Sequence, residues 1–188
     1  MKKVLMHTCC APCSVYCIDS LRSENIEPTI FWYNPNIHPY IEYKTRRDCL
    51  KDYAAKVNAE IIIKEEYGVV EHCKKSLEDL ENRCVKYCYV KRLTETVCYA
   101  KTHSYDAFTT TLLVSPYQKH EELKNLCEQL AAMSGLEFIY RDFRVGYREG
   151  QTKARELGLY MQKYCGCIFS EADRYAKQIT HDQATSVA

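Results

Sequence analysis

Short apolar runs alternate with longer stretches of helical period along this chain, and this alternation restricts its fold more than any other feature. The runs predict β-strands at residues 3–7, 29–33, 60–64, 105–110 and 137–140. Apolar residues spaced by three and four predict helices at 13–25, 40–57, 69–80, 84–101, 120–134 and 169–179. Such alternation favours an α/β domain, with a mostly parallel sheet covered by helices on both faces.

The length and composition are those of a one-domain globular protein. We expect a single α/β domain over residues 1–179 and a frayed polar tail over 180–188. The chain is 46% hydrophobic and 27% charged, and no apolar run is long enough to cross a bilayer, so no membrane partner is expected. Only three apolar residues precede His7, which does not fit a secretory signal. A cytoplasmic location follows, where cysteines bind metals or pack more often than they form disulfides.

Seven of the twelve cysteines fall into three knots: Cys9, Cys10 and Cys13; Cys84 and Cys88; Cys165 and Cys167. The first knot ends a predicted strand and opens a predicted helix, where the helix dipole favours thiolate. The second pair shares one helix face, and Gly166 lets the backbone of the third turn tightly. If the fold joins them, they exceed the four ligands of a structural zinc, which predicts a polynuclear centre or two metals.

Other roles for the cysteines are open at this point. Cys10 and Cys13 also match a redox dithiol, but that would leave the other two knots unexplained. Five cysteines lie outside the knots: we expect Cys49, Cys73, Cys98 and Cys127 to be small core residues, and Cys17 to be either core or site. The loop after the first strand contains no glycine, so a nucleotide phosphate cradle is not expected there.

Iron with sulfide is the metal chemistry that best uses many thiolates, because burial and hydrogen bonding tune its potential for electron delivery. Sulfurs beyond the four cluster ligands, with one carboxylate, would hold a separate iron that has an open position. Asp142 is the best-placed carboxylate, since it directly follows the fifth predicted strand. A pairing with Arg141 or Arg144 is an alternative role of comparable weight.

The charge pattern limits how nucleic acid could be bound. A net charge of +1 excludes binding through the whole surface, but residues 141–155 hold five basic and two acidic side chains with aromatics between them. This segment suits phosphate contacts with base stacking, and an ordinary solvated segment explains it equally well.

Six stretches together resemble the cobalamin-independent epoxyqueuosine reductase family QueH, over roughly residues 4–170. They are HTCCAPC at 7–13, YNPNIHPYIEY at 33–43, RCVKYCY at 83–89 with Arg92, FTTTLLVSPY at 108–117, YRDFR at 140–144 and YCGCIFS at 164–170. One departure is that three residues separate Cys84 from Cys88, where two are usual in the family. A helix presents either spacing on one face.

The resemblance implies an oxidoreductase that removes the epoxide oxygen from epoxyqueuosine at the wobble position of tRNA, the last step of queuosine synthesis. It also implies a fold related to the ATP-using PP-loop-like tRNA-modifying enzymes, here without the glycine-rich nucleotide loop. Its implied partners are tRNA carrying epoxyqueuosine and an electron donor that the sequence does not identify.

The resemblance further implies an iron-sulfur cluster beside a second iron. Our hypothesis places a 4Fe-4S cluster on Cys9, Cys10, Cys84 and Cys88, and the mononuclear iron on Cys165, Cys167 and Asp142, with Cys13 as a reserve ligand. In it, the iron acts as a Lewis acid on the epoxide oxygen and the cluster delivers single electrons. The residues expected to bind nucleoside and tRNA are Asn34, His38, Thr110, Ser115, Tyr117, Arg141, Arg144 and Arg148.

Two rival functions fit parts of the same pattern. A zinc-stabilised RNA-binding module would hold zinc without sulfide and have no activity. An iron-sulfur electron carrier would hold a cluster but lack an open metal position and affinity for tRNA. Metal and sulfide analysis separates the first rival from the enzyme, and an assay on epoxyqueuosine tRNA separates the second.

Overall fold

All five strands of the sheet run parallel, in the order β3-β2-β1-β4-β5, in the computed structural model, which describes residues 2–185. The strands are β1 (Val4–His7), β2 (Pro28–Trp32), β3 (Ile61–Ile63), β4 (Ala107–Thr110) and β5 (Glu137–Phe138). Strand β1 is central, since Val4 pairs with Pro28 on one side and Ala107 on the other. Every residue of β1 is buried, as expected for a parallel strand covered on both faces.

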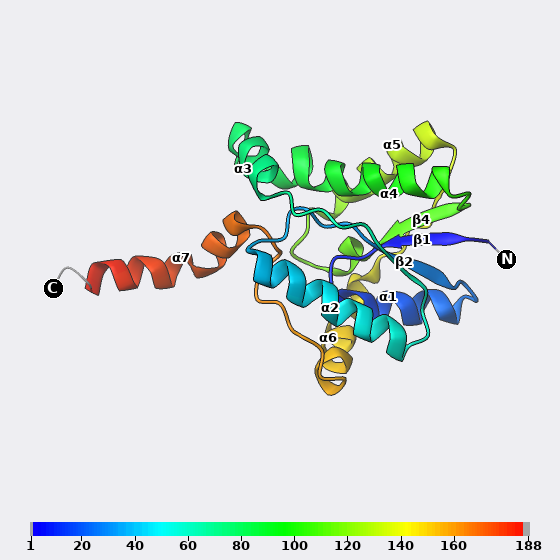
Figure 1. Cartoon of the computed structure of the whole chain (residues 1–188), viewed down its shortest axis with the longest axis horizontal. Helices are drawn as coiled ribbons and strands as arrows, with labels where there is room; N and C mark the ends of the chain where they lie inside the picture. The colour runs from blue at the N-terminus through cyan, green and yellow to red at the C-terminus, as the bar shows by residue number, and fades with distance from the viewer. Residues whose placement is uncertain (1, 186–188) are drawn as a thin grey trace.

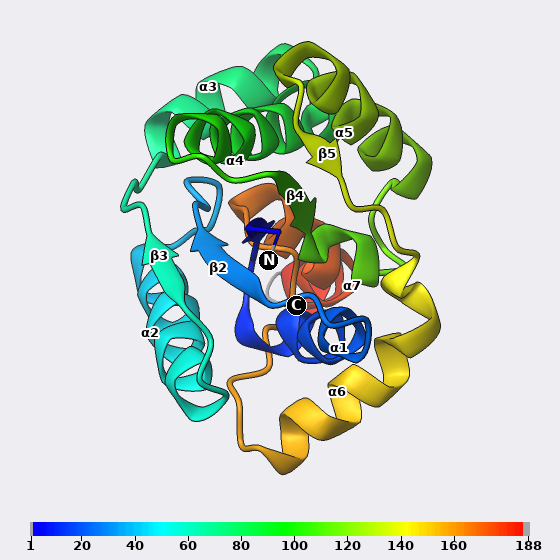
Figure 2. The same cartoon turned by 90° about the vertical axis from the view of Figure 1, so that its right-hand side faces the viewer.

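Helices cover both faces of this sheet (Figure 2). One face carries α1 (Ala11–Ser23), α2 (Tyr40–Lys56) and α6 (Tyr147–Glu156), and the other carries α4 (Val90–Thr102) and α5 (His120–Ser134). Helix α3 (Val69–Glu78) packs against the short helix η1 (Cys84–Tyr89) that leads into α4. The predicted α/β class, with a parallel sheet between two helical layers, is therefore confirmed.

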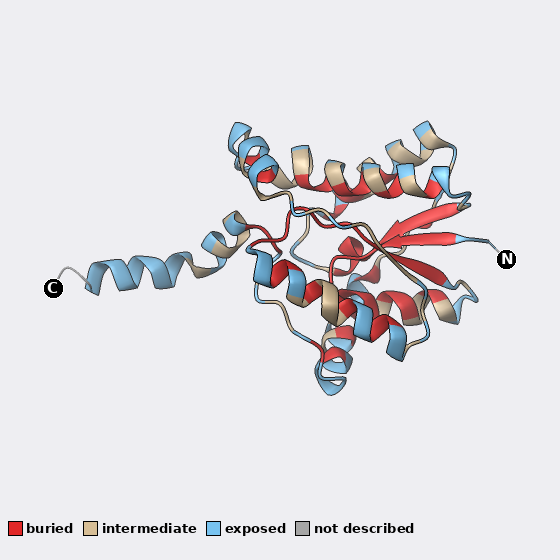
Figure 3. Cartoon of the chain, in the orientation of Figure 1, coloured by how far each residue is buried: buried red, intermediate tan, exposed pale blue. Residues whose placement is uncertain are grey.

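The core forms because alternate strand residues point to opposite faces of the sheet. Leu5 and Phe31 pack with Ala100 of α4, whereas Met6 and Trp32 pack with the α1 and α2 side. All five side chains are fully buried, and each except the small alanine stabilises the fold by about 1.5–3 kcal/mol. Figure 3 shows the central strands of the sheet coloured as buried. A Leu5→Ala change would cost about 2–5 kcal/mol by leaving a cavity.

Two helical segments differ from the sequence prediction. Helix α6 lies inside the basic segment 141–155, for which we predicted no helix, because its few apolar residues hide the helical period. Helix α7 (Ile168–Thr185) projects away from the body of the protein (Figure 1) and buries no residue. It continues past 179, so residues 180–185 of the predicted frayed tail are helical, while 186–188 lie outside the described residues.

The cysteines outside the knots follow the prediction in part. Cys127 and Cys17 are fully buried, and Cys49 and Cys73 are half-buried. Cys98 is exposed, so the prediction of a core position was wrong: it lies beside Val97 in sequence but on the solvent side of α4. No helix within residues 2–185 is both long and apolar enough to span a membrane.

Candidate metal centre and active site

The first cysteine knot is formed by the junction of β1 and α1. The sulfur atoms of Cys9, Cys10 and Cys13 all lie within 4.8 Å of one another, and the Sγ atoms of Cys9 and Cys10 are 3.8 Å apart. Cys10 is the N-cap of α1, Pro12 lies in its first turn, and no side chain caps the helix. The N–H groups of that turn therefore remain available to an anionic sulfur centre.

Protons are unevenly shared among these three sulfurs. The pKa of Cys9 lies well below the ordinary thiol value, because Cys10 and Cys13 donate hydrogen bonds to its sulfur and Thr111 adds a third. Burial raises the pKa of Cys10, and the pKa of Cys13 is raised because it donates to Cys10 and Cys9. Cys9 is therefore the thiol of this knot that loses its proton most readily, and metal binding would release the protons of the other two.

The second and third knots lie beside each other. Cys84 and Cys88 lie on η1, a single π-helical segment of a kind that often marks functional sites. Burial raises the pKa of both thiols, and the charges of Cys165 and Cys167 raise it further. These four sulfurs are therefore within electrostatic reach, although η1 and the 165–167 loop are far apart in sequence.

The Cys165–Cys167 loop is held by buried polar contacts. Arg46 donates hydrogen bonds to the carbonyl oxygens of Cys165 at 2.8 Å and Tyr164 at 3.0 Å. The backbone N–H of His38 donates to the carbonyl oxygen of Gly166 at 2.8 Å. Gly166 has φ 157°, and a Cβ there would lie 3.1 Å from Ile37. Only glycine fits this close approach, which accounts for its place between the two cysteines.

Arg92 links the first knot to the other two. Burial lowers the pKa of its guanidinium, but the charges of Cys88, Cys165 and Cys9 outweigh this and raise it above the ordinary arginine value. One member of each knot therefore acts on the same guanidinium. The three knots therefore lie around one guanidinium at the carboxyl edge of the sheet, where ligand sites of open α/β sheets lie, and among residues 2–185 the first knot is the one whose sulfurs lie within 4.8 Å of one another.

The donor set fits a metal centre built on soft ligands. All seven knot cysteines are free thiols, and every one except Cys165 and Cys84 is buried. The charge balance fits as well, because Arg92 is a buried cation that has no carboxylate partner within residues 2–185. Thiolates carrying iron and sulfide would supply both the soft ligands and the missing negative charge.

Asp142 occupies a different setting from the cysteines. Its two carboxylate oxygens accept hydrogen bonds from Arg144 at 2.7 and 2.6 Å, and it caps the short helix Phe143–Gly146. The hydrogen bond from Arg144 holds the pKa of Asp142 below its usual range. This is the alternative role that the sequence left open, so Asp142 would have to release Arg144 before binding iron.

Three of the predicted substrate-binding residues are buried in the wall of the site. Asn34 donates to the carbonyl of Thr8 at 2.9 Å, and Thr110 is 2.9 Å from Nδ1 of His7. His38 is 2% exposed and packs against His72, with ring centroids 5.1 Å apart. Burial lowers the pKa of His7 to about 3, so its ring stays neutral beside the first knot.

The other predicted substrate-binding residues lie nearer the surface. Tyr117 is 82% exposed, and its ring centroid is 6.1 Å from that of Tyr147 in α6. Arg148 is also exposed and forms no ion pair in the described part of the chain. The remaining three have partners within the protein. Ser115 accepts a hydrogen bond from the N–H of Tyr117, Arg141 forms an ion pair with Glu24, and Arg144 forms one with Asp142.

Three hydrogen-bond donors to the sulfurs were missed by the sequence analysis. Gln118 donates to Cys165 at 3.4 Å, Gln162 to Cys13 at 3.5 Å, and Thr111 to Cys9 at 3.6 Å. Gln118 and Thr111 belong to the segment that follows β4. Their position after a strand, at the edge where the knots meet, was the available signal.

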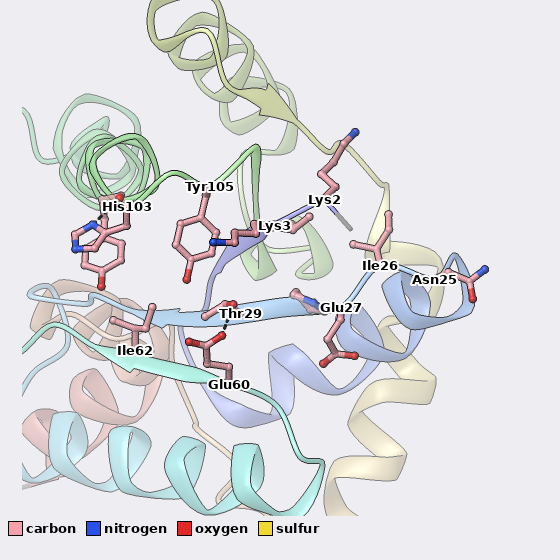
Figure 4. A pocket seen from close by; sticks show the side chains of 13 residues that line it. Lys2, Lys3, Asn25, Ile26, Glu27, Thr29, Glu60, Ile62, His103 and Tyr105 are labelled. Carbon is pink, nitrogen blue, oxygen red and sulfur yellow. Dashed lines mark hydrogen bonds between the residues drawn. The ribbon is translucent and has the colours of Figure 1, made fainter.

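A cavity of about 560 Å³ lies at the opposite, amino-terminal edge of the sheet (Figure 4). Lys3, Thr29, Glu60 and Tyr105 are among its 13 lining residues, and no cysteine is. It is therefore separate from the cysteine site.

Comparison with known proteins decides the family. A family model described as "Epoxyqueuosine reductase QueH" matches residues 4–173. The chain belongs to this family. It is accordingly an oxidoreductase, as the sequence predicted, and the match spans every knot.

Curated QueH proteins align with nearly the whole chain. Those of Dehalococcoides mccartyi and Thermotoga maritima are 35% and 33% identical to it, over 93% and 94% of this chain and 96% and 94% of their own. The protein of Haemophilus influenzae is 31% identical over 91% of this chain and 72% of its own. All three are named "Epoxyqueuosine reductase QueH".

A solved structure resembles this QueH chain in fold. It is described as a predicted subunit of tRNA methyltransferase from Methanocaldococcus jannaschii, with a TM-score of 0.52 and 15% identity, over 81% of this chain and 75% of that one. At this identity the likeness shows the fold alone. It agrees with the predicted α/β class.

Proposed function

We propose that this protein reduces epoxyqueuosine to queuosine at the wobble position of tRNA in the cytoplasm, the last step of queuosine synthesis. The epoxide accepts two electrons and two protons, leaving an alkene in the nucleoside and one water. The observation that carries the proposal is the meeting of three cysteine knots at one sheet edge in a member of the QueH family. An electron donor, not identified by the sequence, completes the balance.

The proposed metal ligands are the residues of the three knots. Cys9, Cys10, Cys84 and Cys88 would hold the 4Fe-4S cluster, and Cys165, Cys167 and Asp142 the adjacent iron. Cys13, whose sulfur lies within 4.8 Å of those of Cys9 and Cys10, would be the reserve ligand to either metal. When bound, this centre supplies single electrons and an electrophilic metal position. Gln118 and Gln162 would orient Cys165 and Cys13 through their hydrogen bonds to sulfur.

Substrate would approach from the side of Cys165. It is the one exposed cysteine of the knots, whereas Cys88 and Cys167 are 5% and 6% exposed. An anticodon base must leave its stack to reach a buried centre, and aromatic side chains compensate by stacking with it. The rings of Tyr117 and Tyr147 would serve this purpose, and Arg148 would contact a phosphate.

Two features oppose the rival functions. An electron carrier needs neither an exposed thiol beside its cluster nor an exposed aromatic pair such as Tyr117 and Tyr147. A structural zinc module needs four ligands, and the knots provide seven sulfurs. Both features favour a catalytic centre with an open metal position.

The test is purification without oxygen, followed by iron, zinc and sulfide analysis and an assay on tRNA that carries epoxyqueuosine, with a chemical reductant. We expect iron and sulfide together and conversion to queuosine. Zinc without sulfide would establish the RNA-binding module instead. A cluster with no conversion under any reductant would establish the electron carrier.

A further inference from the structure

Arg92 is a buried arginine without a counter-ion. Its side chain is 1% exposed and donates two hydrogen bonds to Cys88: Nε donates to the carbonyl oxygen at 3.1 Å, and Nη2 donates to the sulfur at 3.1 Å. No carboxylate lies within ion-pair distance of it in the described part of the chain. An isolated buried charge is strongly unfavourable unless another charge compensates it.

The other arginines near the knots are compensated. Arg46 is also 1% exposed, but it pairs with Glu42 at 2.6 Å. Arg83, at the start of η1, pairs with Asp173 of α7. Arg92 therefore differs from its neighbours in lacking a protein anion, although it is as deeply buried as any of them.

The negative charge nearest to Arg92 is sulfur. It contacts Cys88 directly, and Cys165 and Cys9 also act on its guanidinium. A metal–thiolate centre would keep a negative charge on these sulfurs, and that charge would stabilise the buried guanidinium of Arg92.

We propose that Arg92 is the built-in counter-charge of the metal centre, which neutralises it and donates an N–H group to the Cys88 sulfur. This positioning role rests on the proposed function. A positive charge and a hydrogen bond at a ligand sulfur both favour the reduced, more negative state of an iron-sulfur centre. Arg92 should therefore raise its reduction potential and tighten metal binding.

The experiment compares Arg92→Met, Arg92→Lys and Arg47→Met with the wild type. Arg47→Met is the matched control, since it removes the same formal charge from an arginine paired with Asp48 and Glu65. Potential is measured by redox titration with spectroscopic detection, and metal retention by competition with a chelator. Both readouts are independent of turnover.

We expect Arg92→Met to shift the midpoint potential to more negative values and to weaken metal retention by about 10–100-fold, the usual range for residues that support metal ligands. Arg92→Lys keeps the charge but not the two-donor geometry, so its midpoint potential and metal retention should lie between those of Arg92→Met and the wild type. Arg47→Met should match the wild type in both. Thermal unfolding of the metal-free proteins gives an independent test, through the direction in which the variant changes stability. Metal-free Arg92→Met should be at least as stable as the metal-free wild type, because it removes an uncompensated buried charge.

Wild-type potential and metal retention in Arg92→Met would overturn the inference, as would a metal-free variant less stable than the metal-free wild type. Should Arg92→Met fail to fold, Arg92→Lys with wild-type potential and retention would overturn it equally. The proposed function fails separately, when a loaded wild-type protein does not convert epoxyqueuosine tRNA. If the centre holds zinc, the same chelator competition still tests Arg92.

Discussion

The first cysteine knot and the pair formed by the second and third reach the same edge of the sheet by different means. Cys9, Cys10 and Cys13 belong to one strand–helix junction, which brings their sulfurs within 4.8 Å of one another. Cys88 and Cys165 come from a π-helical segment and a loop, held by long-range contacts such as that of Arg46 with Cys165. Local structure forms the first group, whereas packing of the whole chain forms the second.

The two groups also differ in exposure. All three cysteines of the first knot are at most 8% exposed, while Cys165 is open to solvent. A buried preformed group suits a cluster that must be shielded, and a partly open group suits the metal position that meets substrate. Variants of each group should therefore fail in different ways.

The largest expected effect is that of Cys10→Ser, in the preformed group. Removal of this sulfur should sharply reduce cluster retention even with Cys13 in reserve, with loss of iron and sulfide together and a fall in turnover of about 100-fold. Cys127→Ser is the matched control, because Cys127 is equally buried but packs in α5 away from the knots. A Cys10→Ser protein with full sulfide content would contradict the ligand role.

Cys165→Ala should separate the two groups. We expect it to retain the absorption and sulfide of the cluster but to lose about one iron per chain and most of its turnover, of the order of 100-fold. Cys98→Ala provides the control, since Cys98 is an exposed thiol outside the knots. Loss of sulfide in Cys165→Ala would instead make Cys165 a cluster ligand and merge the two groups into one.

A smaller effect, about 10-fold in turnover and iron retention, is expected of Asp142→Ala. The reason is that Asp142 would supply one ligand after releasing Arg144, which now occupies both its oxygens. Arg144→Ala should retain iron, because it removes only the competitor for the carboxylate. Wild-type iron content and turnover in Asp142→Ala would restrict Asp142 to its observed pairing with Arg144.

The same contrast explains how much could be predicted from sequence. The strands and the first knot follow from local patterns: buried apolar runs, a strand end, and Pro12 in a first helical turn. The edge at which the knots lie is the one that the rule for parallel sheets gives for ligand sites, and that rule uses the order of the elements alone. These inferences need no knowledge of distant contacts.

Contacts between distant segments were beyond the sequence. Nothing local indicates that Arg46 holds the Cys165 backbone or that Gln162 reaches Cys13. The pairing of Asp142 with Arg144 is local, and it is one of the two roles that the sequence offered for this carboxylate. Helix α6 was missed because a strongly polar segment gives a weak helical period. The predicted ligand partition between cluster and iron stays a prediction for the same reason.

The smallest effect concerns pH, and in the second group it should act through His72. His72 is 1% exposed, and neither of its ring nitrogens has a hydrogen-bond partner among residues 2–185. Its ring packs against Tyr87, which precedes Cys88 in the sequence, and Phe169, which follows Cys167 by two residues. Burial lowers its pKa to about 4. The folded protein keeps His72 neutral until the pH nears 4, whereas the same side chain in the unfolded chain binds a proton near pH 6.5. Proton binding by the unfolded chain therefore lowers the free energy of unfolding as the pH falls from 6.5 toward 4, and this loss is absent above 6.5.

Between pH 7.5 and 6, His72 should therefore lower the free energy of unfolding by about 1 kcal/mol. His72→Leu should flatten this dependence, and His103→Gln, at an exposed histidine, is the control. Amide exchange, corrected for its intrinsic pH dependence, should rise on acidification in α3 and η1 of the wild type, and His72→Leu should remove this rise. An equal rise in α3 and η1 of the wild type and of His72→Leu would contradict the role of His72.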